Sequence, residues 1–371
     1  MTQAANLGAL GTNAGTTGIL ASTGGGTGTT AGVTGFKNRI INGAMVINQR
    51  NGTTAQTNVN GFVTDRFQAL NQSSGTINAQ TVTTAPAGFT YSTKLTVGTA
   101  DASVGAADSV IFYQALEGFS IAGLNWGTAN AKVATISFWV YSSLTGNYSG
   151  SLVDQAGNYS FPFNYTISLA NTWEQKSITI AAPTSGGTFG TINNVGVYLE
   201  FSLMTGTNFQ GTANAWSVGN FRGTSSQVNW MATSGNTWFI TGVQLEVGST
   251  ATSFDYRPYG TELALCQRYC NKLVYENTGA VVTGYVDSTT SARGAITFPT
   301  MRTSVSASAS SASHFKLDNG SGAYVGTGIL FDGLTPTSAR MVLTSSGMTA
   351  GQGGIFLSVN NSAFILLTAE L

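Results

Sequence analysis

Charge is scarce in this sequence. Asp, Glu, Lys and Arg make up 8% of its 371 residues, and the 15 basic residues balance the 15 acidic ones. An ordinary soluble domain is about 25% charged, so this protein presents mainly hydroxyl and amide groups. No cluster of Lys and Arg appears, and such clusters hold the phosphates of nucleic acids. The composition therefore excludes nucleic acid as the partner.

Cysteine and histidine are almost absent. Cys266 and Cys270 cannot build a disulfide framework, and no CxxC or histidine pair lies near them to complete a zinc site. His314 is the single histidine and stands in a serine-rich stretch without a motif, so a Ser-His-Asp or Cys-His arrangement could use no other base. We expect two reduced, packed cysteines, and we predict no metal, no cofactor and no catalytic residue.

Long apolar runs are missing as well. No stretch approaches the ~20 apolar residues of a membrane span, and the N-terminus lacks the basic start and apolar stretch of a secretory signal. We expect no membrane insertion and no export by that route, which leaves release by cell lysis. The length exceeds that of one typical domain and predicts two globular units plus an appendage.

Residues 1–36 contain no charged residue and consist mostly of Gly, Thr and Ala. No independent core can form from them, so they are either a flexible tether or an extended arm that becomes ordered against a partner. Composition alone favours the tether, whereas we expect the docked arm. Its anchoring positions would be the larger apolar residues Leu7, Leu10, Ile19, Leu20, Val33 and Phe36.

Residues 37–258 read as short strands separated by Gly, Asn, Ser and Thr turns, the spacing of a sandwich or barrel. Residues 135–141 alternate with the two-residue period of a strand, and both faces are substantially apolar. Residues 154–158 form the expected turn of a hairpin. In residues 238–247, strict alternation predicts that one face carries Phe239, Val243, Leu245 and Val247. The opposite face would carry Gln244 and Glu246 together with Trp238 and Ile240.

One helix is predicted, from Thr261 to about Leu273. Thr261 can cap it, Glu262 favours its first turn, and Leu263, Cys266 and their neighbours give it an apolar side. Strands return over residues 274–371, which predicts a second β domain.

Several segments resemble the modular fibre and tail-associated proteins of tailed phages, and the resemblance covers most of residues 38–371. The strings NRIINGAM (38–45), INQR (47–50) and TDRF (64–67) resemble the start of their jelly-roll domain, which is similar to carbohydrate-binding modules. Its end is matched by ITGVQLEVG (240–248) and FDYRPYGTELALCQRY (254–269), and the distal domain more weakly by ITFP (296–299) and TAEL (368–371). The adaptor domain that such tail fibres conventionally carry has no counterpart before Lys37, so attachment to the tail and attachment to the head both stay open.

The resemblance implies an all-β fold: a jelly-roll sandwich, one short helix and a second β-sandwich-like domain behind an extended arm. The division is 1–36 arm, 37–258 jelly roll, 259–273 linking helix and 274–371 C-terminal β domain. It further implies a non-enzymatic virion protein, assembled in the host cytoplasm as a homotrimeric tail-fibre-like appendage, which docks on other virion proteins through residues 1–36 and adheres to host glycans. A capsid head fibre or decoration protein is the alternative, followed by a polysaccharide-degrading spike.

Candidate glycan-binding residues are Trp216 and Trp230, in polar loops, and Tyr198, Gln244 and Glu246, on polar strand faces. For any single tryptophan, core packing or a subunit interface is the competing interpretation. A glycosidase would need two carboxylates, for which Glu200 and Glu246 are the candidates, although hydrogen bonding at an interface explains them equally well.

Two further polar groups have simple structural interpretations. Asp154 and Asn158 could offer oxygens to calcium, but a turn accounts for them. Asp65, Arg66 and Arg257 are expected to form a structural ion pair near the close of the first domain or to contact a neighbouring subunit.

Overall fold

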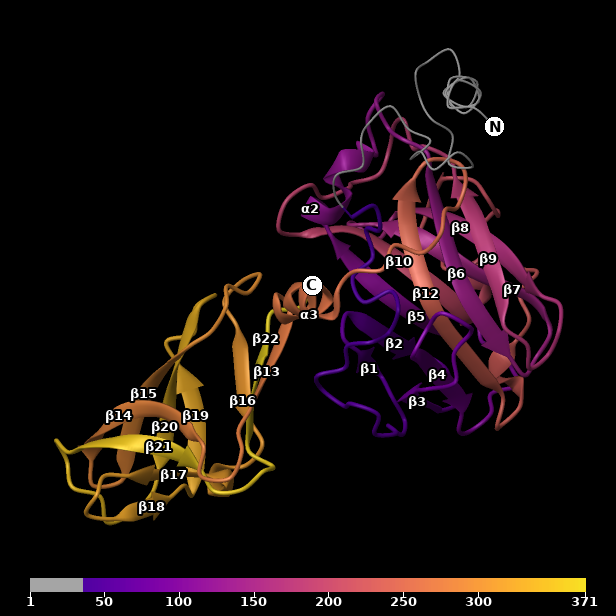
Figure 1. The fold of residues 1–371 in the computed structure, drawn as a ribbon. Helices are drawn as coiled ribbons and strands as arrows, with labels where there is room; N and C mark the ends of the chain where they lie inside the picture. The colour runs from indigo at the N-terminus through magenta and orange to yellow at the C-terminus, as the bar shows by residue number, and fades with distance from the viewer. Residues whose placement is uncertain (1–35) are drawn as a thin grey trace, which may run out of the picture.

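The computed structural model describes residues 36–371, and this part of the chain is almost entirely β-structure, arranged as two lobes on either side of helix α3 (Figure 1). The predicted all-β fold is confirmed. Of the predicted anchor positions, Leu7, Leu10, Ile19, Leu20 and Val33 lie outside the described residues. Phe36 is 49% exposed, and its ring lies 5.3 Å from the guanidinium carbon of Arg257.

The first lobe is a jelly-roll sandwich of two antiparallel sheets. The seven-stranded sheet contains, in spatial order, β1 (Gly61–Thr64), β2 (Phe67–Asn71), β5 (Ser109–Glu117), β10 (Val195–Thr205), β7 (Gly146–Asp154), β8 (Tyr159–Ile167) and β11 (Ser217–Val218). The five-stranded sheet contains β3 (Ile77–Val82), β4 (Ser92–Val97), β12 (Thr237–Val247), β6 (Ala134–Ser142) and β9 (Glu174–Ile180).

The sandwich core is built from alternate residues of both sheets. Ile136, Phe138 and Val140 of β6 are fully buried, as the predicted alternation requires, and the residues between them point to the outer face. The Phe138 ring meets Phe201 of β10 edge-to-face at 4.9 Å, so the two sheets interlock through aromatic side chains. Each such buried side chain contributes roughly 1.5–3 kcal/mol by leaving water.

A bulge in β12 changes which residues face the core. Gly242 has φ +64°, and the pairing with β6 shifts register between Thr241 and Gln244. The core therefore receives Trp238 and Ile240 before the bulge and Val243 and Leu245 after it. The prediction that Phe239 shares a face with Val243 is wrong, because the extra residue inverts the alternation.

The linking helix is shorter than predicted. Helix α3 covers Tyr259–Gln267 and begins after Pro258, so Thr261 is not its cap. Residues 270–274 leave the predicted helix because they pair with the C-terminal strand, Cys270 opposite Thr368 and Val274 opposite Phe364. A second short helix, α2 (Gly118–Ile121), and four 3₁₀ turns, at Ala122–Leu124, Thr207–Phe209, Trp230–Ala232 and Ala312–His314, were not predicted. None of the helices in residues 36–371 is long and apolar enough to cross a bilayer.

The second lobe also consists of two antiparallel sheets around its own core. The smaller contains β13 (Cys270–Val274), β22 (Phe364–Thr368) and β16 (Ser306–Ala309). The larger contains β18 (Ala323–Val325), β17 (Phe315–Asp318), β21 (Gly353–Ser358), β14 (Ala280–Ser288), β15 (Ser291–Thr297), β20 (Ser338–Thr344) and β19 (Gly328–Asp332). A turn at residues 359–363 joins β21 to β22.

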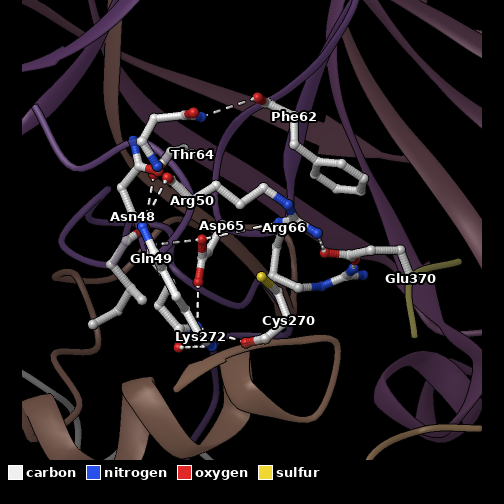
Figure 2. A network of polar contacts seen from close by, with 12 residues as sticks. Asn48, Gln49, Arg50, Phe62, Thr64, Asp65, Arg66, Cys270, Lys272 and Glu370 are labelled. Atoms are coloured by element: carbon white, nitrogen blue, oxygen red, sulfur yellow. Dashed lines mark hydrogen bonds and ion pairs between the residues drawn. The ribbon is translucent and has the colours of Figure 1, made fainter. Parts of the chain in front are cut away.

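The C-terminus returns to the junction of the two lobes, beside α3 (Figure 1). Glu370 forms ion pairs with Arg50 and Arg66 of the sandwich (Figure 2). The Arg66 guanidinium also lies 3.6 Å from the centre of the Tyr269 ring. Leu371 packs into a small apolar cluster that includes Cys266. The last two residues therefore hold the two lobes together.

Further polar contacts cross the same junction. The Gln49 amide donates to the Asp65 carboxylate and to the Cys270 carbonyl oxygen, both at 2.6 Å (Figure 2). Arg302 donates to the Asn193 carbonyl oxygen at 2.9 Å. Burial raises the pKa of Asp65, against the Gln49 hydrogen bond and the Arg50 charge, which lower it.

Candidate functional site

A row of cross-strand neighbours crosses the outer face of the five-stranded sheet. Gln80 pairs with Lys94, Lys94 with Phe239, and Phe239 with Tyr141. Trp173, just before β9, continues the row, with its ring 5.6 Å from that of Tyr141. Since paired strands lie about 4.8 Å apart, the row spans about 19 Å. We call these five residues the aromatic row.

The rings of the aromatic row support one another. Phe239 and Tyr141 meet edge-to-face with centroids 4.8 Å apart, and Phe239 lies 6.2 Å from Trp173. Phe239 is 7% exposed beneath its neighbours, whereas Tyr141 and Trp173 are only partly buried. The two outer rings are therefore partly exposed above a buried neighbour, which suits stacking of a flat or apolar ligand surface.

A second group of rings stands beside the row. Phe89, Phe254 and Tyr256 contact one another with centroids 4.8 to 5.4 Å apart, and Tyr256 is 54% exposed. We call these three residues the aromatic wall. It reaches the sheet at Gly242, where an added Cβ would lie 2.7 Å from the Phe89 ring and 3.0 Å from Trp139. The bulge in β12 therefore makes the space into which Phe89 packs.

The predicted ligand residues Gln244 and Glu246 lie on this outer face but serve the fold. Both are buried, and the Gln244 amide donates to Glu246 at 2.8 Å. Glu246 also accepts from the backbone and hydroxyl of Thr252, and the Gln244 oxygen accepts from the Asp255 backbone. These bonds hold the segment that carries the wall, so the two side chains are occupied.

A hollow of about 370 Å³ lies between strand β9 and this segment. It is lined by Gln175, Lys176, Ser177, Ala251, Thr252 and Ser253. Gln175 is the cross-strand neighbour of the partly buried Trp139. The face therefore combines aromatic surface with amide and hydroxyl groups at its side.

The other predicted ligand residues do not join this face. Trp230 is fully buried in the sandwich core, which removes it from the ligand candidates. Trp216 packs among four rings at the edge of the seven-stranded sheet, stacked on Tyr159 at 5.4 Å, and its indole donates to the Ala181 carbonyl oxygen. Tyr198 lies on the outer face of the seven-stranded sheet, 6.3 Å from Tyr113.

The two candidate glycosidase carboxylates lie on different sheets. Glu200 points outward from β10, whereas Glu246 points outward from β12 of the opposing sheet. With roughly 10 Å between packed sheets and both groups facing away from the core, they cannot flank one glycosidic bond. Glu200 and Glu246 therefore do not share a polar face. Burial raises the pKa of Glu200 to about 7, and the Arg222 charge offsets this only in part.

The remaining chemical candidates have structural surroundings. Cys266 and Cys270 are buried free thiols, and the His314 imidazole lies 2.9 Å from the Ser310 hydroxyl. Asp154 accepts from three backbone N–H groups, those of Asn158, Tyr159 and Thr188, which is the turn role. Within residues 36–371, no three His, Cys, Asp or Glu side chains gather as a metal site.

Asp65, Arg66 and Arg257, predicted to form an ion pair near the end of the first domain, do not pair with one another. Each lies near an oppositely charged residue elsewhere in the chain. Arg66 pairs with Glu370, Arg257 with Glu262, and Asp65 lies 4.0 Å from Arg50.

Sequence reasoning missed most of the row. The second apolar face of residues 135–141 carries Trp139 and Tyr141, and it is the signal that the sequence offers. Strict alternation puts Phe239 on the same face as Val243, because it does not account for the bulge at Gly242. Lys94 and Trp173 come from segments distant in sequence, and only the strand order β4-β12-β6-β9 brings them together.

No protein-family model matches this sequence, and neither does any curated protein. Among solved structures, the enzymatically active domain of bacteriophage CBA120 tailspike protein 4 is similar, with 15% identity and a TM-score of 0.30, over 57% of this chain and 21% of that chain. The match thus spans about a fifth of the tailspike chain's length.

Carbohydrate-binding modules are among the other similar structures. One is TmCBM61 in complex with beta-1,4-galactotriose, with 10% identity and a TM-score of 0.29, over 57% of this chain and 99% of that one. Another is the family 11 module of a cellulosomal cellulase of Clostridium thermocellum, with 10% identity and a TM-score of 0.28, over 54% and 97%. At these scores the likeness says nothing about what this chain binds.

Proposed function

We propose that this protein is a non-enzymatic adhesion component of a phage particle and that it binds host-surface carbohydrate on the outer face of its five-stranded sheet. The observation that carries the proposal is the aromatic row, in which Tyr141 and Trp173 present accessible rings over the buried Phe239. Most large apolar side chains of the sandwich are in its core, so core packing does not explain why partly exposed rings gather on an outer sheet face. Ligand binding does explain such a gathering.

Carbohydrate fits the chemistry of this face. A pyranose ring has a face of C–H bonds, which packs on aromatic rings, and an edge of hydroxyls, which needs donors and acceptors. Ligand sites commonly combine aromatic lining with a few placed polar groups. Gln80 within the row and Gln175 and Ser177 in the adjacent hollow supply such groups.

The separation of Glu200 from Glu246 supports a binding role over hydrolysis by these two carboxylates. Glu200 and Glu246 belong to opposing sheets, and Glu246 is occupied by Gln244 and Thr252. The phage setting, the homotrimer and docking through residues 1–36 rest on the sequence resemblance.

The test is a glycan array probed with the wild-type protein and with a Tyr141→Ala/Trp173→Ala double variant. We expect the double variant to lose at least about tenfold in affinity, because each stacked ring contributes on the order of 1 kcal/mol. Tyr285→Ala is the matched control, since Tyr285 is 51% exposed on β14 of the other lobe. Unchanged binding by the double variant would show that the row is not the site.

A further inference from the structure

We infer that the ligand of the aromatic row is an acidic carbohydrate, whose sugar carboxylate pairs with Lys94. This inference rests on the proposed function and adds the chemical class of the ligand. Lys94 lies in the row itself, between Gln80 of β3 and Phe239 of β12. Its ammonium nitrogen is 5.6 Å from the centre of the Phe239 ring, within range of a cation–π contact.

Lys94 has no counterion among the described residues. Eight ion pairs occur within residues 36–371, and Lys94 belongs to none of them. The same part of the chain offers its ammonium group no hydrogen-bond acceptor either. The strand nevertheless fixes the face on which Lys94 lies, because Lys94 alternates with the fully buried Leu95 in β4 and is itself partly buried.

Three other charged side chains near this face, those of Lys37, Glu246 and Asp255, already have hydrogen-bond partners. The Lys37 ammonium group donates to the Thr252 hydroxyl. Glu246 accepts from Gln244 and from Thr252. Asp255 accepts from the backbone of Lys37 at 2.7 Å, as part of the same return segment. Within the row itself Lys94 is the one charged residue, and it has no ion-pair partner among residues 36–371.

This placement distinguishes acidic from neutral sugars. A neutral sugar stacked on Tyr141 would leave the Lys94 ammonium to water, whereas a uronic or sialic acid brings a carboxylate to it while its ring stacks. A charge-assisted hydrogen bond beside low-dielectric aromatic surface is stronger than one to a neutral hydroxyl. We expect the acidic form to bind about tenfold more tightly than the same sugar without its charge.

The experiment compares oligouronates with their methyl esters, which keep the sugar backbone and remove the charge. The panel contains oligogalacturonate, oligomannuronate and a glucuronate-containing oligosaccharide, each in both forms, with affinity measured by calorimetry at two salt concentrations. The wild-type protein should bind at least one acid about tenfold more tightly than its ester, and salt should weaken the acid more. Lys94→Met should abolish this preference by lowering the affinity for the acid more than the affinity for the ester, and Lys94→Arg should retain the preference.

The outcomes separate the two ideas. Wild-type binding that favours the esters, or an acid preference that survives in Lys94→Met, overturns the inference while the proposed function stands. Wild-type protein that binds no acid of the panel but binds neutral glycans also overturns it. Loss of all binding in Tyr141→Ala/Trp173→Ala, with the preference lost in Lys94→Met, supports both. A protein that binds no carbohydrate at all overturns the proposed function as well.

Discussion

The carboxylate of Glu370 lies 2.9 Å from the Arg50 guanidinium, although 320 positions separate them in the chain. The same carboxylate pairs with Arg66, whose side chain is 2% exposed. A buried guanidinium that loses its partner keeps its desolvation cost, so this contact couples the folding of the two lobes.

Glu370→Ala should therefore destabilise the protein by roughly 3–5 kcal/mol, the cost of leaving a buried charge unpaired. We expect its guanidinium-induced unfolding to split into two transitions, because the lobes have separate cores. Asp332→Ala is the control, since it breaks the exposed Arg340–Asp332 pair and should cost at most about 1 kcal/mol. A single unshifted transition for Glu370→Ala would contradict the coupling.

Glu200→Gln should change how stability depends on pH. Burial raises the pKa of the Glu200 carboxyl from 4.5 to about 7, so the folded protein holds this proton more tightly than the unfolded chain. Stability should fall as pH rises from about 4.5 to about 7 and stay lower by roughly 3 kcal/mol above that range. The Gln variant removes this fall and should be the more stable form at pH 8.

The measurement is urea unfolding of both proteins between pH 4 and pH 8. Glu276→Gln is the control, because Glu276 is exposed and its replacement should change stability by less than about 0.5 kcal/mol. Parallel pH curves for wild type and Glu200→Gln would show that the pKa of Glu200 is the same in the folded and the unfolded protein.

The sandwich could be predicted because its strands obey local rules. Residues 135–141 alternate in the sequence, and β6 buries Ile136 and Phe138 as that alternation demands. The turn at residues 154–158 closes the β7–β8 hairpin, with Gly157 at φ +67°. In both cases the signal and the structure lie within the same few residues.

The remaining features depend on partners far away in the sequence. The helix expected to reach Leu273 stops at Gln267 because the following residues pair with β22, almost a hundred positions later. Trp230, in a polar loop, is buried because its ring enters the core between the sheets. No local sequence pattern predicts that Arg66 pairs with Glu370 or that Lys94 lies beside Phe239.

Gly242→Ala should impair both stability and binding. Its φ of +64° strains any residue with a Cβ, and that Cβ would also lie 2.7 Å from the Phe89 ring. We expect a loss of about 2–4 kcal/mol, together with weaker glycan binding as the aromatic wall shifts.

Gly52→Ala isolates the backbone strain at another site. Gly52 has φ +57°, and an added Cβ would meet nothing within 4 Å, so the cost should be about 1–2 kcal/mol with binding unchanged. Both stabilities are measured by thermal unfolding. Equal losses of stability in Gly242→Ala and Gly52→Ala would show that contact with the Phe89 ring adds nothing to the cost at Gly242.

The two thiols should report whether the junction is closed. Burial raises the pKa of Cys270 to about 12 and also raises that of Cys266, so neither forms the reactive thiolate at pH 8. We expect Ellman's reagent to label no thiol in the native protein and both in guanidinium. Because Leu371 packs in the cluster that holds Cys266, deletion of residues 370–371 should make labelling measurable without denaturant. Rapid labelling of the intact native protein would mean that the lobes separate in solution.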